Sequence, residues 1–106
     1  AIRGNAEEPI LLTDINMPFK YALNDPYPNP FNPTTTIKLA LMDEHNNFNL
    51  KIYDIRGRLV KEIYNGYINY GYHKFTWDAS SYASGIYLVR MIAGDNIFSK
   101  KITLLK

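Results

Sequence analysis

The side chains that could carry out catalysis or bind a metal are few, and they are scattered along the chain. Two histidines are present, His45 and His73, and neither has a second histidine or a cysteine at a spacing typical of metal ligands. Asp43 and Glu44 lie in a predicted turn and Asp78 lies far from them in sequence, so no pair of carboxylates is marked as a general acid and base. No glycine-rich phosphate-binding loop is present. The sequence therefore predicts a domain that is not an enzyme and that holds no metal or cofactor.

Tyrosines are concentrated in one stretch, where Tyr64, Tyr67, Tyr70 and Tyr72 fall within nine residues, close to Trp77. Flat aromatic faces on a rigid sheet can form a platform on which sugar rings stack, as in a carbohydrate-binding module. Tyrosine also has a high strand propensity and commonly covers a half-buried sheet face. We favour the second interpretation, and we expect Trp77 to lie in the core because it shares the alternation of apolar residues in its strand.

The last six residues, Lys101-Ile102-Thr103-Leu104-Leu105-Lys106, form a strand-like segment with a lysine at each end. Lysines at the edge of a sheet are common because their charge discourages aggregation. A final strand with open backbone groups can also be recognised by a partner that adds a strand to it, with the lysines making charge-assisted contacts. Both interpretations stay open on the residues alone.

Length and composition indicate a single domain. A chain of 106 residues with a hydrophobic content of 46% can bury a core without disulfides, and it has no cysteine. The net charge of +2 is too small to indicate a nucleic-acid partner. No apolar run approaches the roughly 20 residues needed to span a bilayer, so we expect no membrane insertion. The first 16 residues lack the basic start and apolar core of a signal peptide, so an export signal is expected upstream if the protein is exported.

From Pro18 onward, apolar and polar residues alternate with a period of two, which is typical of β-strands and not of helices. Turn signals separate the runs, among them Gly57 at a left-handed hairpin position and a tight hairpin at 94–96. Six or seven short strands with this spacing predict an all-β antiparallel sandwich, in which only the connection 78–84 is expected to hold a single helical turn. The predicted core contains Leu39, Leu50, Ile52, Trp77 and Leu88.

Four of the six prolines, Pro26, Pro28, Pro30 and Pro33, lie within eight residues and directly precede a predicted strand. Each proline fixes its own φ angle and favours an extended conformation in the residue before it. The segment is therefore expected to be an ordered, non-repetitive entry loop to the β-domain. Residues 1–16 are expected to be a linker or the end of a preceding domain, and the domain itself to span residues 17–106.

Five short motifs follow one another in an order that is itself informative. They are YPNPFNPTTTI at 27–37, IYDIRGR at 52–58, GYHKFTWD at 71–78, SGIY at 84–87, and the tail lysines Lys101 and Lys106. Through these motifs the chain resembles the type A C-terminal domain of proteins exported by the type IX secretion system. Each motif alone is weak, but five in the right order over about 80 residues agree with one another. A related immunoglobulin-like module occurs in flagellar hook-capping proteins, so the fold by itself does not decide the function.

The resemblance implies an immunoglobulin-like antiparallel β-sandwich of about seven strands that acts as a secretion signal. Such a domain directs a passenger, lying upstream in the same chain, through the outer membrane by binding the type IX translocon and its shuttle proteins. A sortase-like peptidase would remove the domain at the surface, so the protein would be secreted or reach the cell surface by way of the periplasm. A carbohydrate-binding module and a passive immunoglobulin-like spacer of a secreted enzyme stay open as alternatives.

The resemblance also implies roles for individual residues. Recognition by the translocon is carried over onto Lys101, Leu104, Leu105 and Lys106. Structural roles are expected at the family motif positions Pro28, Asn29, Pro30, Gly85 and Tyr87.

Overall fold

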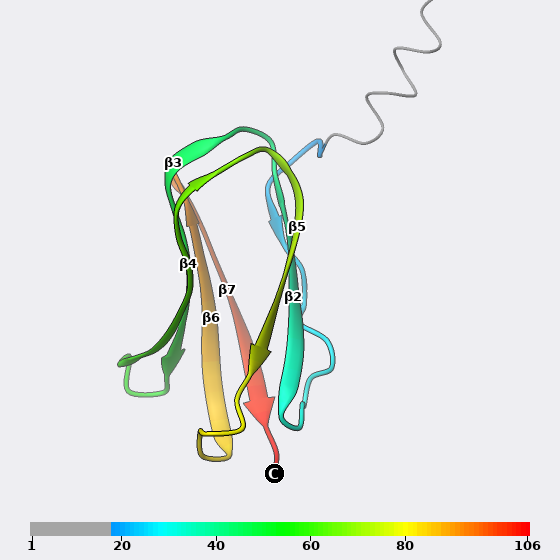
Figure 1. Ribbon diagram of the computed structural model, residues 1–106, viewed down its shortest axis with the longest axis vertical. Helices are drawn as coiled ribbons and strands as arrows, with labels where there is room; N and C mark the ends of the chain where they lie inside the picture. Colours follow the sequence, from blue (N-terminus) through cyan, green and yellow to red (C-terminus); the bar gives the residue numbers. More distant parts are fainter. Residues whose placement is uncertain (1–17) are drawn as a thin grey trace, which may run out of the picture.

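The computed structural model describes residues 18–106, and the expected linker over residues 1–16 lies outside this range. Seven strands form two antiparallel sheets that pack face to face, as Figure 1 shows, so the predicted immunoglobulin-like sandwich is confirmed. The strands are β1 (Ala22–Leu23), β2 (Thr34–Leu41), β3 (His45–Asp54), β4 (Leu59–Ile68), β5 (Gly71–Asp78), β6 (Gly85–Ala93) and β7 (Asn96–Leu104).

One sheet has the strand order β1-β2-β5 and the other the order β4-β3-β6-β7. The chain passes between the sheets after β2, after β4 and after β5, and these crossings lie at the two ends of the sandwich (Figure 1). The last strand, β7, is thereby left at one edge of the four-stranded sheet, with β6 as its only neighbour there. The loop before β2 comes down to the same end of the molecule as the C-terminus (Figure 1).

The core lies between the sheets and is built from the inward-facing residues of each strand. The predicted core residues Leu39, Leu50, Ile52 and Trp77 are all buried, which confirms the alternation in β2, β3 and β5. Trp77 lies at the centre of an aromatic group, with its ring 5.4–5.6 Å from the rings of three other residues, Phe31, Tyr82 and Tyr87. Tilted and edge-on contacts of this kind stabilise a core beyond the effect of the buried area.

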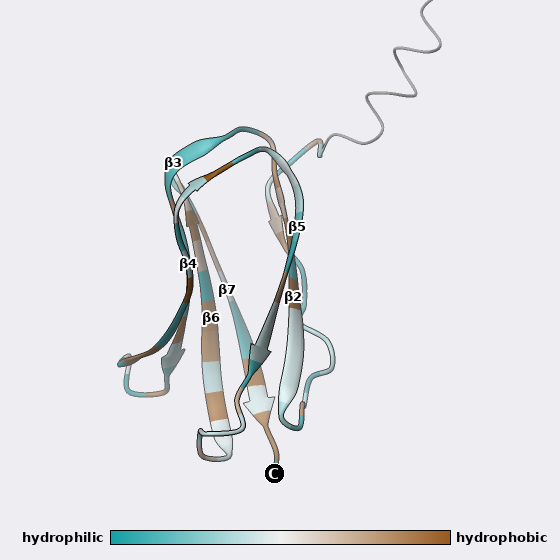
Figure 2. Ribbon diagram, in the orientation of Figure 1, coloured by the Kyte–Doolittle hydropathy of each residue, from teal (hydrophilic) through white to brown (hydrophobic). Residues whose placement is uncertain are grey.

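The prediction that Leu88 lies in the core is wrong. Its side chain is 38% exposed, whereas its neighbours Tyr87 and Val89 are buried. Both faces of β6 carry apolar residues, so hydrophobicity alone did not distinguish them; Figure 2 shows hydrophobic and hydrophilic bands along this strand. The distinguishing residue is Arg90, which shares a face with Leu88. In a central strand a guanidinium group must face water, because burying it without a partner is costly.

The connection between β5 and β6 forms no helix, in contrast to the predicted helical turn over 78–84. It is a hydrogen-bonded turn in which the Tyr82 N–H donates to the Ala79 carbonyl at 3.0 Å. The predicted hairpin at 94–96 is confirmed, with Ala93 paired with Asn96 across a two-residue loop.

The turn between β3 and β4 has the predicted chemistry, with Gly57 at a φ of 82°. The Asp54 carboxylate accepts hydrogen bonds from the backbone N–H of Arg56 (2.9 Å) and Arg58 (3.0 Å) and from Arg58 Nε (2.9 Å). These contacts, with the Arg58 backbone bond the largest, lower the pKa of Asp54 from its ordinary value.

We expect Asp54→Asn to lower the melting temperature at neutral pH and to have no effect in strong acid. A carboxylate whose pKa is lowered by folding stabilises the native state above its unfolded pKa, near 3.9, and this stabilisation is lost as the pH falls through the lower folded value. Thermal melts of both proteins between neutral pH and about pH 2 measure the difference. Asp95→Asn, in the β6–β7 loop, is the control for a simple change of net charge. A difference between wild type and Asp54→Asn that is independent of pH would contradict this account.

Candidate functional site

The proline-rich loop and the C-terminal tail, which are far apart in sequence, are joined by hydrogen bonds. We call residues 27–33 the clasp loop. The Phe31 N–H donates to the Thr103 carbonyl at 2.9 Å, and the Leu105 N–H donates to the Phe31 carbonyl at 3.0 Å. These bonds form a parallel bridge between Phe31 and Leu104. The clasp loop therefore covers the outer edge of β7 at its C-terminal end.

Asn29 extends this pairing with its side chain. Its amide nitrogen donates to the Lys101 carbonyl at 3.1 Å, and its amide oxygen accepts from the Thr103 N–H at 3.0 Å. The amide thus takes the place of a backbone unit in a neighbouring strand. The flanking residues Pro28 and Pro30 have no N–H group of their own that would need a partner in the loop.

The clasp loop is also fixed to the opposite sheet. Tyr27 and Thr36 exchange backbone hydrogen bonds of 3.0 and 2.9 Å, and the buried Thr35 hydroxyl donates to the Pro28 carbonyl at 2.8 Å. The Phe31 ring is 2% exposed and packs on Trp77. The loop consequently connects the edge of β7 to both β2 and the core.

We expect Asn29→Asp to lower the free energy of unfolding by about 1–2 kcal/mol. The substitution replaces the amide donor by a carboxylate oxygen that faces the Lys101 carbonyl, so an attraction becomes a repulsion. Urea unfolding measures the loss. Asn32→Asp is the matched control, because it introduces the same charge at another exposed asparagine that precedes a proline in this loop. Equal losses in the two variants would show that the added charge, and not the lost hydrogen bond, is responsible.

The four tail residues predicted to be recognised have different environments. Lys101 and Leu105 are exposed, whereas Leu104 is fully buried and its side chain belongs to the core. The exposed Lys106 is attached to the β5–β6 connection: its backbone N–H donates to Ser84 Oγ at 3.0 Å, and its ammonium group donates to the Ser80 carbonyl. In the folded domain a partner therefore meets three of the four side chains.

The neighbourhood of Lys106 carries a further charged group. Hydrogen bonds from the Ser80 hydroxyl and backbone N–H lower the pKa of Asp78, and the positive charge of Lys106 contributes in the same direction. Asp78 is therefore a carboxylate at neutral pH, and it adds an acidic group to the surface around the tail.

The family motif positions in β6 have structural environments. The Tyr87 hydroxyl donates to the Ala83 carbonyl at 2.6 Å, and its ring meets Trp77 edge-on. Gly85 pairs with Leu104 at the start of the β6–β7 ladder, and a Cβ atom there would meet nothing within 4 Å. Its φ of 155° is the feature that favours glycine.

Beside Lys101 the outer face of the four-stranded sheet carries apolar side chains. A groove of about 390 Å³ is lined by Tyr53, Ile55, Ile86, Leu88, Arg90 and Lys101, among others. Ile55, Ile86 and Leu88 are 78%, 44% and 38% exposed. Neighbouring exposed apolar groups of this kind are typical of protein interaction sites. The sequence signal for this surface was Leu88, which we had assigned to the core.

Two of the residues first considered for catalysis, Asp43 and His45, meet at the Tyr21 hydroxyl, which donates to Asp43 at 3.1 Å and lies 3.0 Å from His45 Nε2. His73 lies apart from them, with its Nε2 2.9 Å from the Asn69 carbonyl. Within residues 18–106 there is no group of three or more histidine, cysteine, aspartate or glutamate side chains that could hold a metal ion. In the same range, no helix with the length and apolar character of a membrane span is found.

The tyrosines do not form one platform. Tyr64 packs between the sheets, with its ring 5.9 Å from Phe48 and 5.6 Å from Phe75. Tyr67 is half exposed and its hydroxyl donates to Glu44 at 2.6 Å. Tyr72 lies on the outer face of the three-stranded sheet, where it is 64% exposed.

Comparisons with known proteins agree with the combination of motifs and fold. The family model described as "Secretion system C-terminal sorting domain" matches residues 26–105. Among solved structures, the chain is similar to PorZ of Porphyromonas gingivalis, a surface component of the type IX secretion system, with 23% identity and a TM-score of 0.52. The match covers 97% of this chain and 12% of PorZ, and at this identity it supports the fold alone.

A second similar structure is CopC of Methylosinus trichosporium OB3b, with 20% identity, a TM-score of 0.43, and coverage of 80% of this chain and 91% of that one. This similarity is too weak to support an argument. No curated protein matches the sequence. The family model covers most of the described residues, including the clasp loop and all but the last residue of the tail, and the chain therefore belongs to the family of secretion system C-terminal sorting domains.

Proposed function

We propose that this domain directs a passenger, encoded upstream in the same chain, through the outer membrane by way of the type IX secretion system. The observation that carries the proposal is the joining of two family motifs, the clasp loop and the tail, into one folded surface. The translocon or a shuttle protein binds this surface, with Lys101, Leu105 and Lys106 making direct contacts. Leu104 holds the strand in place from below.

Two further contacts are available to such a partner. The N–H and C=O groups of successive residues in a strand point alternately to its two edges, so those of Ile97 and Ser99 point to the same edge of β7 as those of Thr103. The clasp loop forms its backbone hydrogen bonds with Thr103 and Leu105 and not with these two residues. A partner strand can therefore pair with the first half of β7. The apolar groove around Leu88 lies next to Lys101 and offers side-chain contacts for the same partner.

The later steps follow from this function. The fusion enters the periplasm, folds there, and is passed through the outer membrane. A sortase-like peptidase then cuts near the segment 1–16 and releases the passenger to the surface or the medium. The domain itself carries out no chemistry, which agrees with a family of sorting signals.

Export of a reporter tests the proposal. The whole chain is fused behind an inner-membrane export signal and a fluorescent protein, and the fusion is expressed in a host with a type IX system. We expect fluorescence outside the cell with the domain and in the periplasm without it. A host that lacks the translocon should keep the fusion in the periplasm. A spacer or a carbohydrate-binding module would not export the reporter, so periplasmic retention of the folded fusion in the competent host would refute the sorting function.

A further inference from the structure

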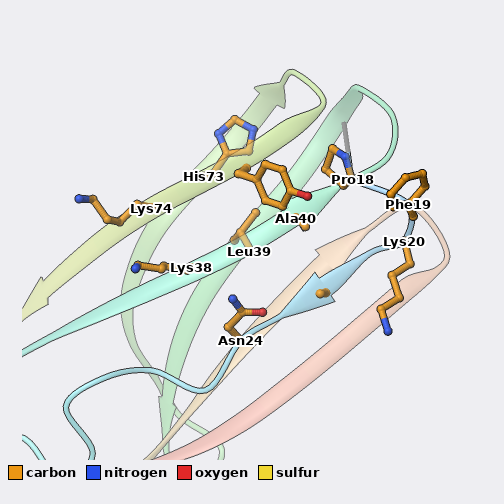
Figure 3. A pocket seen from close by; sticks show the side chains of 11 residues that line it. Pro18, Phe19, Lys20, Asn24, Lys38, Leu39, Ala40, His73 and Lys74 are labelled. Atoms are coloured by element: carbon orange, nitrogen blue, oxygen red, sulfur yellow. The ribbon is translucent and has the colours of Figure 1, made fainter. Parts of the chain in front are cut away.

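The outer face of the three-stranded sheet carries a groove that has no part in the clasp loop or the tail. It has a volume of about 410 Å³ and runs across β1, β2 and β5 (Figure 3). Concave sites of this size are sufficient for a small ligand. The surface is hollowed here because Ala22 and Ala40, which are cross-strand partners on β1 and β2, have short side chains. On the other side of Ala40, its cross-strand partner on β5 is Tyr72.

Two aromatic rings rise above this floor. Phe19 is 81% exposed and Tyr72 is 64% exposed, and both line the groove. Exposed apolar groups that lie close together are typical of binding sites, and a flat ring beside a rigid sheet is well suited to stack on a sugar ring.

Positive charge is concentrated at the same place. Lys38 and Lys74 are direct cross-strand partners, and Figure 3 shows them extending side by side from β2 and β5. Like charges directly opposite each other destabilise a sheet. Within residues 18–106 neither lysine forms an ion pair: Asp25, which lines a neighbouring pocket together with both of them, is paired with Lys100 at 3.0 Å. Lys20 adds a third ammonium group to the lining.

We propose that this groove binds an acidic oligosaccharide. The sugar rings stack on Phe19 and Tyr72, and carboxylates of the ligand pair with Lys38 and Lys74. Asn24, which also lines the groove, supplies an amide for ligand hydroxyls. The bound anion relieves the repulsion between the two lysines, so ligand binding and local sheet stability are coupled. This binding goes beyond the sorting function and does not depend on it.

The test measures binding of hexaguluronate to the whole chain by isothermal titration calorimetry at low salt. We expect saturable binding that weakens as salt is added, and no binding of the neutral maltohexaose. The double variant Lys38→Gln/Lys74→Gln and the single variant Tyr72→Ala should each weaken binding by about tenfold or more, as expected for loss of charge-assisted or stacking contacts. The matched controls are Lys61→Gln and Tyr70→Ala, at an exposed lysine and an exposed tyrosine outside the groove, which should bind as wild type does. Melting temperatures verify that every variant is folded.

Three results would overturn the proposal. The first is the absence of hexaguluronate binding by the folded wild-type chain. The second is an equal loss of affinity in the Lys61→Gln control and the lysine double variant, which would indicate a general attraction between a basic protein and a polyanion. The third is equal affinity for a hexathymidylate oligonucleotide, which would show that the groove does not select sugar rings.

Discussion

A reporter fusion that combines Lys101→Glu with Lys106→Glu is expected to accumulate in the periplasm, although the domain remains folded. Each lysine can form a charge-assisted contact worth about 1–3 kcal/mol with a partner that binds the tail. Loss of both contacts, replaced by repulsion, should lower export by at least about tenfold. Fractionation of the host into periplasm, cell surface and medium measures the effect. The domain should stay folded, because exchanges of exposed charges cost no more than about 0.5 kcal/mol.

The contacts of Lys106 determine how this experiment is controlled. Its ammonium group donates to the Ser80 carbonyl, so Lys106→Glu also places a carboxylate near Asp78. Lys101→Glu alone avoids this local repulsion and should already reduce export. Lys61→Glu, on β4, is the matched control with the same change of charge at an exposed lysine far from the tail in sequence. Wild-type export of the folded double variant would mean that the lysines only protect the edge of the sheet. A deletion of residues 104–106 is less informative, because it removes the buried Leu104.

Phe31→Ala is expected to lower the free energy of unfolding by about 3–5 kcal/mol. The ring is 2% exposed, packs 5.6 Å from the ring of Trp77, and anchors the clasp loop in the core. Its removal leaves a cavity under the loop, and the backbone bonds to Thr103 and Leu105 lose their support. Urea unfolding followed by tryptophan fluorescence reports the change, since Trp77 is the only tryptophan of the chain.

Phe19→Ala is the matched control for this substitution, because the same side chain is lost from a position that is 81% exposed. Its effect on stability should stay within about 0.5 kcal/mol. Phe31→Leu, which keeps part of the buried volume, should lie between the alanine variant and wild type. A Phe31→Ala protein as stable as wild type would show that the loop is held by its hydrogen bonds alone.

The strands were predictable where only one of their faces is apolar. In β3, Phe48, Leu50 and Ile52 alternate with polar residues, and all three are buried. In β6 both faces are apolar, and only Arg90 indicated which one meets water. The turn at Asp54 and Gly57 was predictable because its chemistry is local.

The site was predictable as two separate motifs and not as one surface. A structural role was expected for Asn29 as a motif position, but nothing near it in sequence identifies its partner Lys101, which is 72 residues away. Whether the two meet depends on the packing of the whole sandwich, which no local pattern encodes. The same is true of Lys38 and Lys74, which become neighbours only through the β2–β5 register. Leu104 was expected to take part in recognition, but its side chain is buried in the core. An apolar residue in a recognition motif can therefore have a structural role, and the motif alone does not reveal which of the two it has.

The bonds between the clasp loop and β7 have a consequence for biosynthesis. The ribosome makes residues 27–33 before residues 101–105, and the surface that they share exists only when both are present and the sheets between them have formed. A polypeptide whose translation stops before residue 101 lacks this surface altogether, and a complete but unfolded one has not assembled it. Under the proposed function, the secretion machinery that binds this surface thereby selects passenger proteins whose sorting domain has been translated at least to residue 105 and is correctly folded. Export and quality control would then be a single recognition event.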